Sequence, residues 1–186
     1  MYTAQLKDIR ATLSHMVEAG RLAETERYAE ATDETVAAVL AEAGKLAEGV
    51  LRPVNRAGDL TPARVENGVV RTSPGFAEAY REIADGGWVA MAADPAHGGM
   101  GLPLTYLTAV NELMASGCLS LSLCPLMTQG AIDALETHGT PEQKAVYLPK
   151  MIAGTWTGTM NLTEPNAGSD VGALRAKAEP AGDGSY

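Results

Sequence analysis

Apolar residues recur at helical spacing through most of the first 150 residues of this 186-residue chain. The longest run begins at Asp33 and continues to about Leu51, where Pro53 is expected to end it. Similar stripes predict further helices at 6–17, 73–85, 104–114, 119–138 and 141–152. Several amphipathic helices can bury their stripes only against one another, so we expect an all-helical domain over residues 1–154.

Breaks between these stripes are marked by capping and turn residues. Ser73 and Pro74 are expected to cap one helix, and Gly86-Gly87 to end it. The segment 140–143 matches a capping box, in which Thr140 and Gln143 satisfy each other's backbone N–H groups. From 55 to 71 no helical pattern is expected, and residues 66–69 predict the tight turn of a small hairpin.

The helical spacing of apolar residues ends after Gly154. Residues 155–162 are Thr-rich and predict a strand, 163–170 predict a loop, and 174–179 alternate as a second strand before a turn at Asp183-Gly184. We therefore expect a mainly α protein in which residues 155–186 begin a β-barrel-like middle domain. Because the chain stops in a hairpin turn, we expect it to be part of a longer protein.

Composition narrows the classes of partner. A net charge of −9 and a pI near 4.8 disfavour nucleic acid and anionic membrane surfaces. The apolar stretch 115–132 is interrupted by polar residues, which argues against a bilayer span, and the N-terminus lacks a secretory pattern. Cys118 and Cys124 lack metal-ligand spacing and predict free thiols, so we expect a cytoplasmic protein.

The histidines are scattered and have no obvious catalytic partner. His15 and His138 lie on predicted helices, which favours structural or solvated roles, whereas His97 lies in a glycine-rich turn from 94 to 101 where the backbone must bend sharply. No metalloprotease, nucleophile-elbow or phosphate-loop motif occurs, so hydrolase and nucleotide-triphosphatase activities lack support.

The segment 156–170 carries the most chemical information. A strand leads into a loop with the hydroxyls of Thr163 and Ser169 and with Gly168, which would let a ligand approach the backbone. Such donors suit a planar heterocycle with carbonyl oxygens, or a phosphate. An ordinary polar loop is equally compatible with the residues alone.

Three motifs in this chain resemble those of the acyl-CoA dehydrogenase family. They are Thr163-Glu164-Pro165-x-Ala167-Gly168-Ser169-Asp170, Gly139-Thr140-Pro141-Glu142-Gln143-Lys144 with Tyr147-Leu148-Pro149, and Pro95-x-His97-Gly98-Gly99-x-Gly101. They follow the order and spacing of the family over about half of the chain. The segment Leu51-Arg52-Pro53-Val54-Asn55-Arg56-x-Gly58-Asp59 resembles the longer subgroup that includes 3-(methylthio)propanoyl-CoA dehydrogenases.

This resemblance implies a fold, a cofactor and a set of contacts. The family has an N-terminal helical domain, a middle β domain and a C-terminal helical domain, with FAD between them. It implies that Met160, Asn161, Leu162 and Thr163 contact the pyrimidine side of the flavin, and that Ser169 lies between the FAD pyrophosphate and the acyl-CoA. Gly168 is also expected among the cofactor contacts. Implied partners are an acyl-CoA substrate, an electron-transfer flavoprotein and further copies of the protein.

The resemblance also implies fatty acid metabolism and a reaction. A carboxylate removes an α-proton of the acyl-CoA while a hydride passes to the flavin. The family's base belongs to the C-terminal domain, so the base is expected beyond Tyr186 and no catalytic residue is expected among these 186. Glu164 is expected to be structural, and this chain alone should be inactive. Three alternatives remain open: an acyl-CoA oxidase, a flavin monooxygenase relative, and a noncatalytic helical interaction module.

Overall fold

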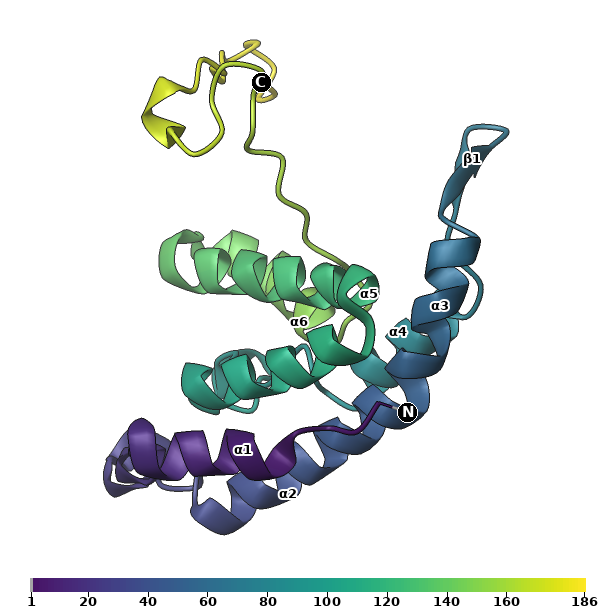
Figure 1. Cartoon of the computed structure of the whole chain (residues 1–186). Coiled ribbons are helices and arrows are strands. Elements are labelled where there is room, and N and C mark those ends of the chain that lie inside the picture. The colour runs from purple at the N-terminus through teal and green to yellow at the C-terminus, as the bar shows by residue number, and fades with distance from the viewer. Residues whose placement is uncertain (1) are drawn as a thin grey trace.

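The computed structural model describes residues 2–186 and is mainly helical (Figure 1). The elements in order are α1 (Leu6–Ala11), α2 (Asp33–Leu46), α3 (Arg52–Leu60), β1 (Arg64–Glu66), β2 (Val69–Arg71), α4 (Phe76–Asp85), α5 (Leu104–His138) and α6 (Pro141–Ile152). Short π-helical or 3-10 turns extend several of them, as at Thr12–Met16 and Ala47–Leu51. The expected helical body is therefore present, while a domain boundary after residue 154 stays a prediction.

Pro53 does not end a helix, contrary to the expectation from sequence. The helix α2 passes through the π-helical turn Ala47–Leu51 directly into α3, which ends only at Leu60. Pro53 is the second residue of α3, directly after the π-helical turn, so its missing N–H falls where the hydrogen-bond pattern has already changed from α-type to π-type. The change to π-type bonding just before it makes this placement possible, so residues 55–60, expected to be irregular, are helical.

The helix α5 is two helices joined at Cys118, as the two apolar stripes predict. Cys118 has the non-helical angles φ −154° and ψ 92°, and the two halves lie one above the other (Figure 1). A hydrogen bond of 3.0 Å from Asn111 Nδ2 to Gln129 Oε1 joins the halves. The first half forms the centre of the core, where Val110, Leu113 and Met114 are almost completely buried with residues of α2, α4 and α6.

By composition alone, α5 is apolar enough to cross a membrane, contrary to the expectation from its polar interruptions. Its most apolar 18-residue window has a mean hydropathy of 1.3. Half of that window is buried inside the structure, and the helix breaks at Cys118. Its packing is therefore that of a core helix.

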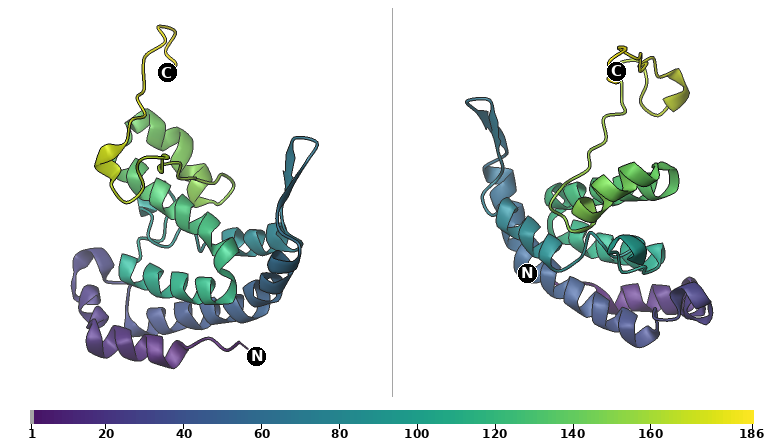
Figure 2. Two further views of the ribbon diagram at one scale, coloured as in Figure 1. Left: turned by 45° about the horizontal axis from the view of Figure 1, so that its top comes forward. Right: turned by 180° about the vertical axis from the view of Figure 1, so that it is seen from behind.

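A β-hairpin follows α3 and projects from the helical body (Figures 1 and 2). Arg64 pairs with Arg71 and Glu66 with Val69, and the turn residues Asn67 and Gly68 both have positive φ, at 53° and 77°. These angles match the two-residue turn that suits the twist of a hairpin. The expected tight turn at 66–69 is confirmed.

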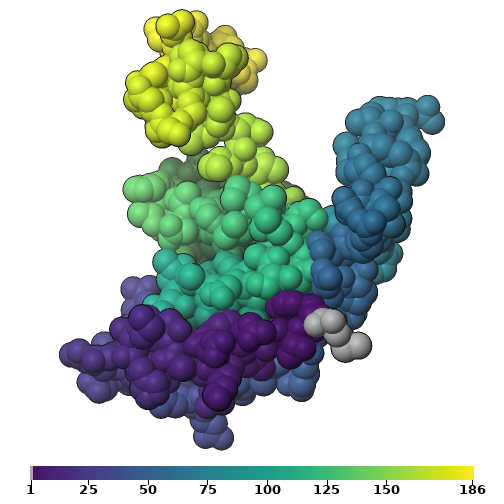
Figure 3. All heavy atoms as spheres, in the orientation of Figure 1, coloured from purple at the N-terminus to yellow at the C-terminus, as the bar shows by residue number. Residues whose placement is uncertain are grey.

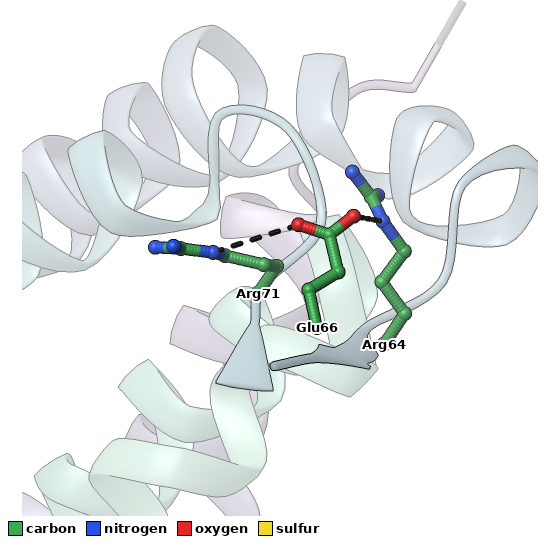
Figure 4. Close-up of polar contacts among 3 residues, drawn as sticks. All are labelled: Arg64, Glu66 and Arg71. Atoms are coloured by element: carbon green, nitrogen blue, oxygen red, sulfur yellow. Dashed lines mark hydrogen bonds and ion pairs between the residues drawn. The ribbon is translucent and has the colours of Figure 1, made fainter. Parts of the chain in front are cut away.

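Two arginines on the hairpin face a single carboxylate. Glu66 lies between Arg64, whose Nε is 2.5 Å from Oε1, and Arg71, whose Nε is 3.6 Å from Oε2 (Figure 4). All three side chains are about half exposed, so each pair contributes at most about 1 kcal/mol.

Helix starts were predicted with mixed success. The capping box at Thr140 is confirmed, since its hydroxyl accepts the N–H of Gln143 at 3.3 Å and the Gln143 side chain accepts the Thr140 N–H at 2.9 Å. The prediction that Ser73 caps the next helix was wrong. The residue before α4 is Gly75, with φ 81°, and Ser73 contributes its carbonyl to a turn ending at Phe76.

The C-terminal residues form no sheet in this structure. Residues 155–162 and 174–179, both expected as strands, have no regular secondary structure and pair with no other described strand. A strand is stable only when its backbone N–H and C=O groups are hydrogen-bonded to an adjacent strand. The single sheet in residues 2–186 is the hairpin β1–β2. The yellow end of the chain stands clear of the helices in the space-filling view (Figure 3), and a β-barrel start is not formed.

Candidate functional site

The segment that leads to the candidate site begins where α6 ends. The carbonyl of Gly154 accepts the hydroxyl of Tyr80 on α4 at 3.0 Å, and the N–H groups of Thr155 and Trp156 both donate to the carbonyl of Lys150, at 3.0 and 3.1 Å. Burial, together with the nearby Cys124 thiol, raises the pKa of Tyr80, so its hydroxyl remains a donor at physiological pH. These bonds fix the point from which the chain leaves the helices.

A second attachment lies two residues further on. The N–H of Gly158 donates to Oγ1 of Thr128 at 3.1 Å, and Thr128 is completely buried on the second half of α5. A Cβ on Gly158 would lie 2.6 Å from the Cβ of Ala131, so the segment touches α5 directly. Sequence reasoning missed Thr128, although a hydroxyl on an otherwise apolar helix face is a signal of a buried polar contact.

The residues predicted to bind the cofactor follow immediately. Met160, Asn161, Leu162 and Thr163 are all exposed, and within residues 2–186 their N–H groups donate to no protein acceptor. The hydroxyls of Thr163 and Ser169 likewise make no hydrogen bond to any described residue. Unused donors on an exposed backbone fit the carbonyl and nitrogen acceptors of a flavin's pyrimidine ring. The assignment itself stays a prediction.

The following loop brings the two ends of the motif together. Glu164 and Ala167 exchange backbone hydrogen bonds of 2.8 and 3.1 Å, and Ala167 is only 3% exposed. A Cβ on Gly168 would lie 3.9 Å from Cγ2 of Thr163, which places Gly168 beside Thr163. The carboxylate of Glu164 accepts two backbone N–H groups, which supports the expected structural role.

The catalytic base was expected beyond Tyr186. Its expected position therefore lies outside the residues that the structure describes. Tyr186 itself is 81% exposed, so the last described residue is not packed into a site. The expectation that the base follows Tyr186 in the longer protein therefore stays a prediction.

An apolar cleft lies between the two halves of α5 and the segment that follows α4. Its volume is about 310 Å³, and Leu104, Leu107, Leu126 and Ile132 form its apolar wall. Asp133 and Glu136 lie at its polar side. No residue from 160 to 169 lines it, so it is separate from the candidate cofactor contacts.

The three histidines have structural or solvated surroundings. His15 and His138 are exposed on helices, and His97 is half-buried in the glycine-rich turn, where Gly98 and Gly101 have φ of 95° and 65°. That turn packs on its own backbone, since the N–H groups of residues 99 and 101 donate to the carbonyls of residues 94 and 93. The sharp bend expected from its glycines is therefore confirmed.

The two cysteines are free thiols, as predicted. Cys118 is buried at the break in α5, and burial raises the pKa of Cys124. Within residues 2–186 no cluster of three potential metal ligands is present.

Comparison with known proteins agrees with the motifs. Residues 33–155 match the family model "Acyl-CoA dehydrogenase, N-terminal domain". Over 185 residues the chain is 41% identical to 3-methylmercaptopropionyl-CoA dehydrogenase of Ruegeria pomeroyi, covering 100% of this chain and 32% of that protein. It is 29% identical over 183 residues to butyryl-CoA dehydrogenase of Syntrophomonas wolfei, covering 96% and 30%.

A solved structure supports the fold. The protein described as "Tcur3481-Tcur3483 steroid ACAD" superimposes with a TM-score of 0.58 and 22% identity, over 81% of this chain and 37% of that one. The chain spans about a third of the length of these relatives. Since the family model covers most of it, the chain belongs to the acyl-CoA dehydrogenase family and contains its N-terminal domain.

Proposed function

We propose that the full-length protein containing this chain is an FAD-dependent acyl-CoA dehydrogenase that oxidises the α,β-bond of an acyl-CoA thioester. The observation that carries this proposal is the 41% identity, over the whole chain, to 3-methylmercaptopropionyl-CoA dehydrogenase. That relative makes 3-(methylthio)propanoyl-CoA the first substrate to test. Short straight-chain and branched acyl-CoAs follow, because butyryl-CoA and isovaleryl-CoA dehydrogenases are also similar.

In this proposal the segment 160–169 holds one edge of the flavin. The N–H groups of Leu162 and Thr163 and the Thr163 hydroxyl donate to its pyrimidine ring, with Met160 and Asn161 beside them. Backbone donors do not depend on side-chain identity, so the Leu162 and Thr163 contacts tolerate sequence change best. Gly168 leaves room for the pyrophosphate, and Ser169 donates to the pyrophosphate and to the acyl-CoA.

The contribution of these donors to the reaction is electrostatic. Bound FAD would supply the hydride acceptor. An α-proton next to a thioester is a weak acid, so the site must stabilise the negative charge that develops as the proton leaves. Donors aimed at the pyrimidine edge favour extra negative charge on that ring, which makes hydride acceptance easier.

The general base is proposed to lie beyond Tyr186, in the part of the longer protein that follows this chain. The carboxylate of Glu164 is occupied as an acceptor of two backbone N–H groups, so it is poorly suited to abstract a proton. We further propose a cytoplasmic homo-oligomer that passes electrons to an electron-transfer flavoprotein. The cleft beside α5 offers apolar surface, but none of the candidate cofactor contacts lines it, which leaves the acyl-binding surface to be found by experiment.

The test uses the purified full-length protein with its flavin. Anaerobic addition of 3-(methylthio)propanoyl-CoA should bleach the flavin absorbance, and butyryl-CoA and isovaleryl-CoA serve as comparison substrates. Turnover should need an artificial electron acceptor or an electron-transfer flavoprotein. Stoichiometric peroxide without an acceptor would instead indicate an oxidase, oxidation of a non-thioester substrate would indicate a monooxygenase relative, and absence of flavin would favour a noncatalytic module.

A further inference from the structure

The carboxylate of Glu164 closes the loop that carries the candidate flavin contacts. Its Oε2 accepts the N–H of Arg175 at 2.9 Å, and its Oε1 accepts the N–H of Ala176 at 2.8 Å. Each oxygen therefore takes one of two successive backbone amides. Hydrogen bonds to an ionised carboxylate are stronger than those between neutral groups.

Two further contacts tie the same loop. Asn166 Nδ2 donates to the carbonyl of Ala173 at 3.0 Å, and Glu164 and Ala167 exchange backbone hydrogen bonds. The side chains of the loop thus bond to its own backbone, as in compact loops whose two ends lie close together. The loop reaches this arrangement without a pairing strand.

The two hydroxyls predicted to meet the cofactor lie next to this closed loop and within it. Thr163 immediately precedes Glu164, and Ser169 lies between the two ends that the carboxylate joins. Gly168 lies beside the methyl group of Thr163. Loss of the carboxylate contacts would free residues 164–175 to move, and with them the separation of the two hydroxyls.

We propose that Glu164 is a positioning residue that holds Thr163 and Ser169 in the arrangement that receives FAD. The inference rests on the function proposed above. Glu164 acts through these two residues and touches neither cofactor nor substrate. Preorganised donors bind more tightly because no ordering is needed at the moment of binding.

The experiment compares Glu164→Gln with wild type in the full-length protein. Glutamine keeps the size but replaces one acceptor oxygen with an NH₂ group that faces a backbone N–H. We expect FAD affinity to fall roughly ten-fold or more, the size expected for loss of a charged hydrogen bond. The flavin absorbance bands should shift, and hydrogen exchange at the amides of Arg175 and Ala176 should accelerate.

Matched variants separate positioning from general destabilisation. Glu112→Gln makes the same chemical change on an exposed face of α5, where the side chain bonds to no described residue, and should leave all three measurements at wild-type values. Glu164→Asp keeps the charge but reaches less far, so its FAD affinity should lie between wild type and Glu164→Gln. If Glu164→Gln does not fold, Glu164→Asp takes its place in every measurement.

A double-mutant cycle with Thr163→Ala gives the decisive result. If Glu164 acts through Thr163, the double variant should lose much less FAD affinity than the product of the two single losses. Wild-type affinity and spectrum in Glu164→Gln, or independent effects both in this cycle and in the matching cycle with Ser169→Ala, would overturn this inference and leave the proposed function intact. A wild-type protein without flavin would overturn both.

Discussion

The buried hydroxyl of Thr128 holds the C-terminal segment to α5 through the N–H of Gly158, at 3.1 Å. Thr128 donates its own hydrogen to the carbonyl of Cys124 at 2.9 Å, which directs an oxygen lone pair toward Gly158. This is the last hydrogen bond between the helices and the chain before the candidate site, within the residues that the structure describes. The position of Met160 to Thr163 relative to α5 therefore depends on it.

Replacing Thr128 with valine should release this attachment. Valine matches the shape of threonine but leaves the Gly158 N–H without an acceptor, which costs about 1–3 kcal/mol. Urea unfolding should show that loss, and hydrogen exchange at Gly158 should accelerate. Thr128→Ser keeps the hydroxyl and should preserve the slow exchange. Equal exchange in the valine and serine variants would show that the hydroxyl does not hold the segment.

Helix α6 should be sensitive to its capping box. Thr140→Ala removes the acceptor for the Gln143 N–H and should lower the free energy of unfolding by about 0.5–2 kcal/mol. Thr140→Ser retains the oxygen and should cost much less. Thermal unfolding followed by circular dichroism gives both values, and an alanine variant as stable as the serine variant would contradict the prediction.

Short sequence patterns correctly predicted the elements that are determined by residues adjacent in the sequence. The capping box at Thr140 and the Asn67-Gly68 turn were identified because a few adjacent residues determine them. The break near Cys118 was recognised because two apolar stripes meet there. Pro53 was misjudged because its effect depends on a π-helical turn that no sequence pattern marks.

The sequence predicts which residues of the candidate site carry hydrogen-bond donors, and their role at a cofactor stays a prediction. In the structure, Met160 to Thr163 and Ser169 are exposed. The contacts that place them join residues far apart in sequence, such as Gly158 with Thr128, and only the folded chain shows such pairs. The strands predicted at 155–162 and 174–179 failed for a related reason, since alternation indicates a strand but cannot supply its neighbour.

Gly154 should resist substitution because of both its conformation and its surroundings. Its φ is 70°, and a Cβ there would lie 2.6 Å from the Cβ of Ala84 on α4. Gly68 is the matched control, because its φ is 77° and a Cβ there would have no atom within 4 Å. Alanine at Gly68 should therefore cost only the roughly 1 kcal/mol of holding a non-glycine residue at positive φ. Chemical denaturation should therefore show a larger loss for Gly154→Ala than for Gly68→Ala. Equal losses would mean that α4 moves aside freely.

The chain of residues 1–186 should not retain FAD when purified alone. Its predicted contacts, Met160 to Thr163 with Gly168 and Ser169, are exposed and reach the cofactor from one side only. A ligand held along one edge stays largely solvated, whereas cofactor sites usually bury most of the ligand surface. Gel filtration after incubation with FAD, read at the flavin absorbance, measures retention. A stoichiometric yellow complex would contradict this expectation.

Thr163→Ala in the full-length protein should weaken flavin binding or slow flavin reduction. The variant removes one hydroxyl donor and keeps the Thr163 N–H, so the loss should correspond to one hydrogen bond, about 0.5–1.5 kcal/mol or up to roughly ten-fold in affinity. Thr163→Ser retains the donor and controls for the lost methyl group beside Gly168. FAD titration and anaerobic stopped-flow reduction by substrate provide the two measurements. If alanine and wild type agree in both, the hydroxyl of Thr163 does not face the flavin, and the segment 160–169 must be assigned another role.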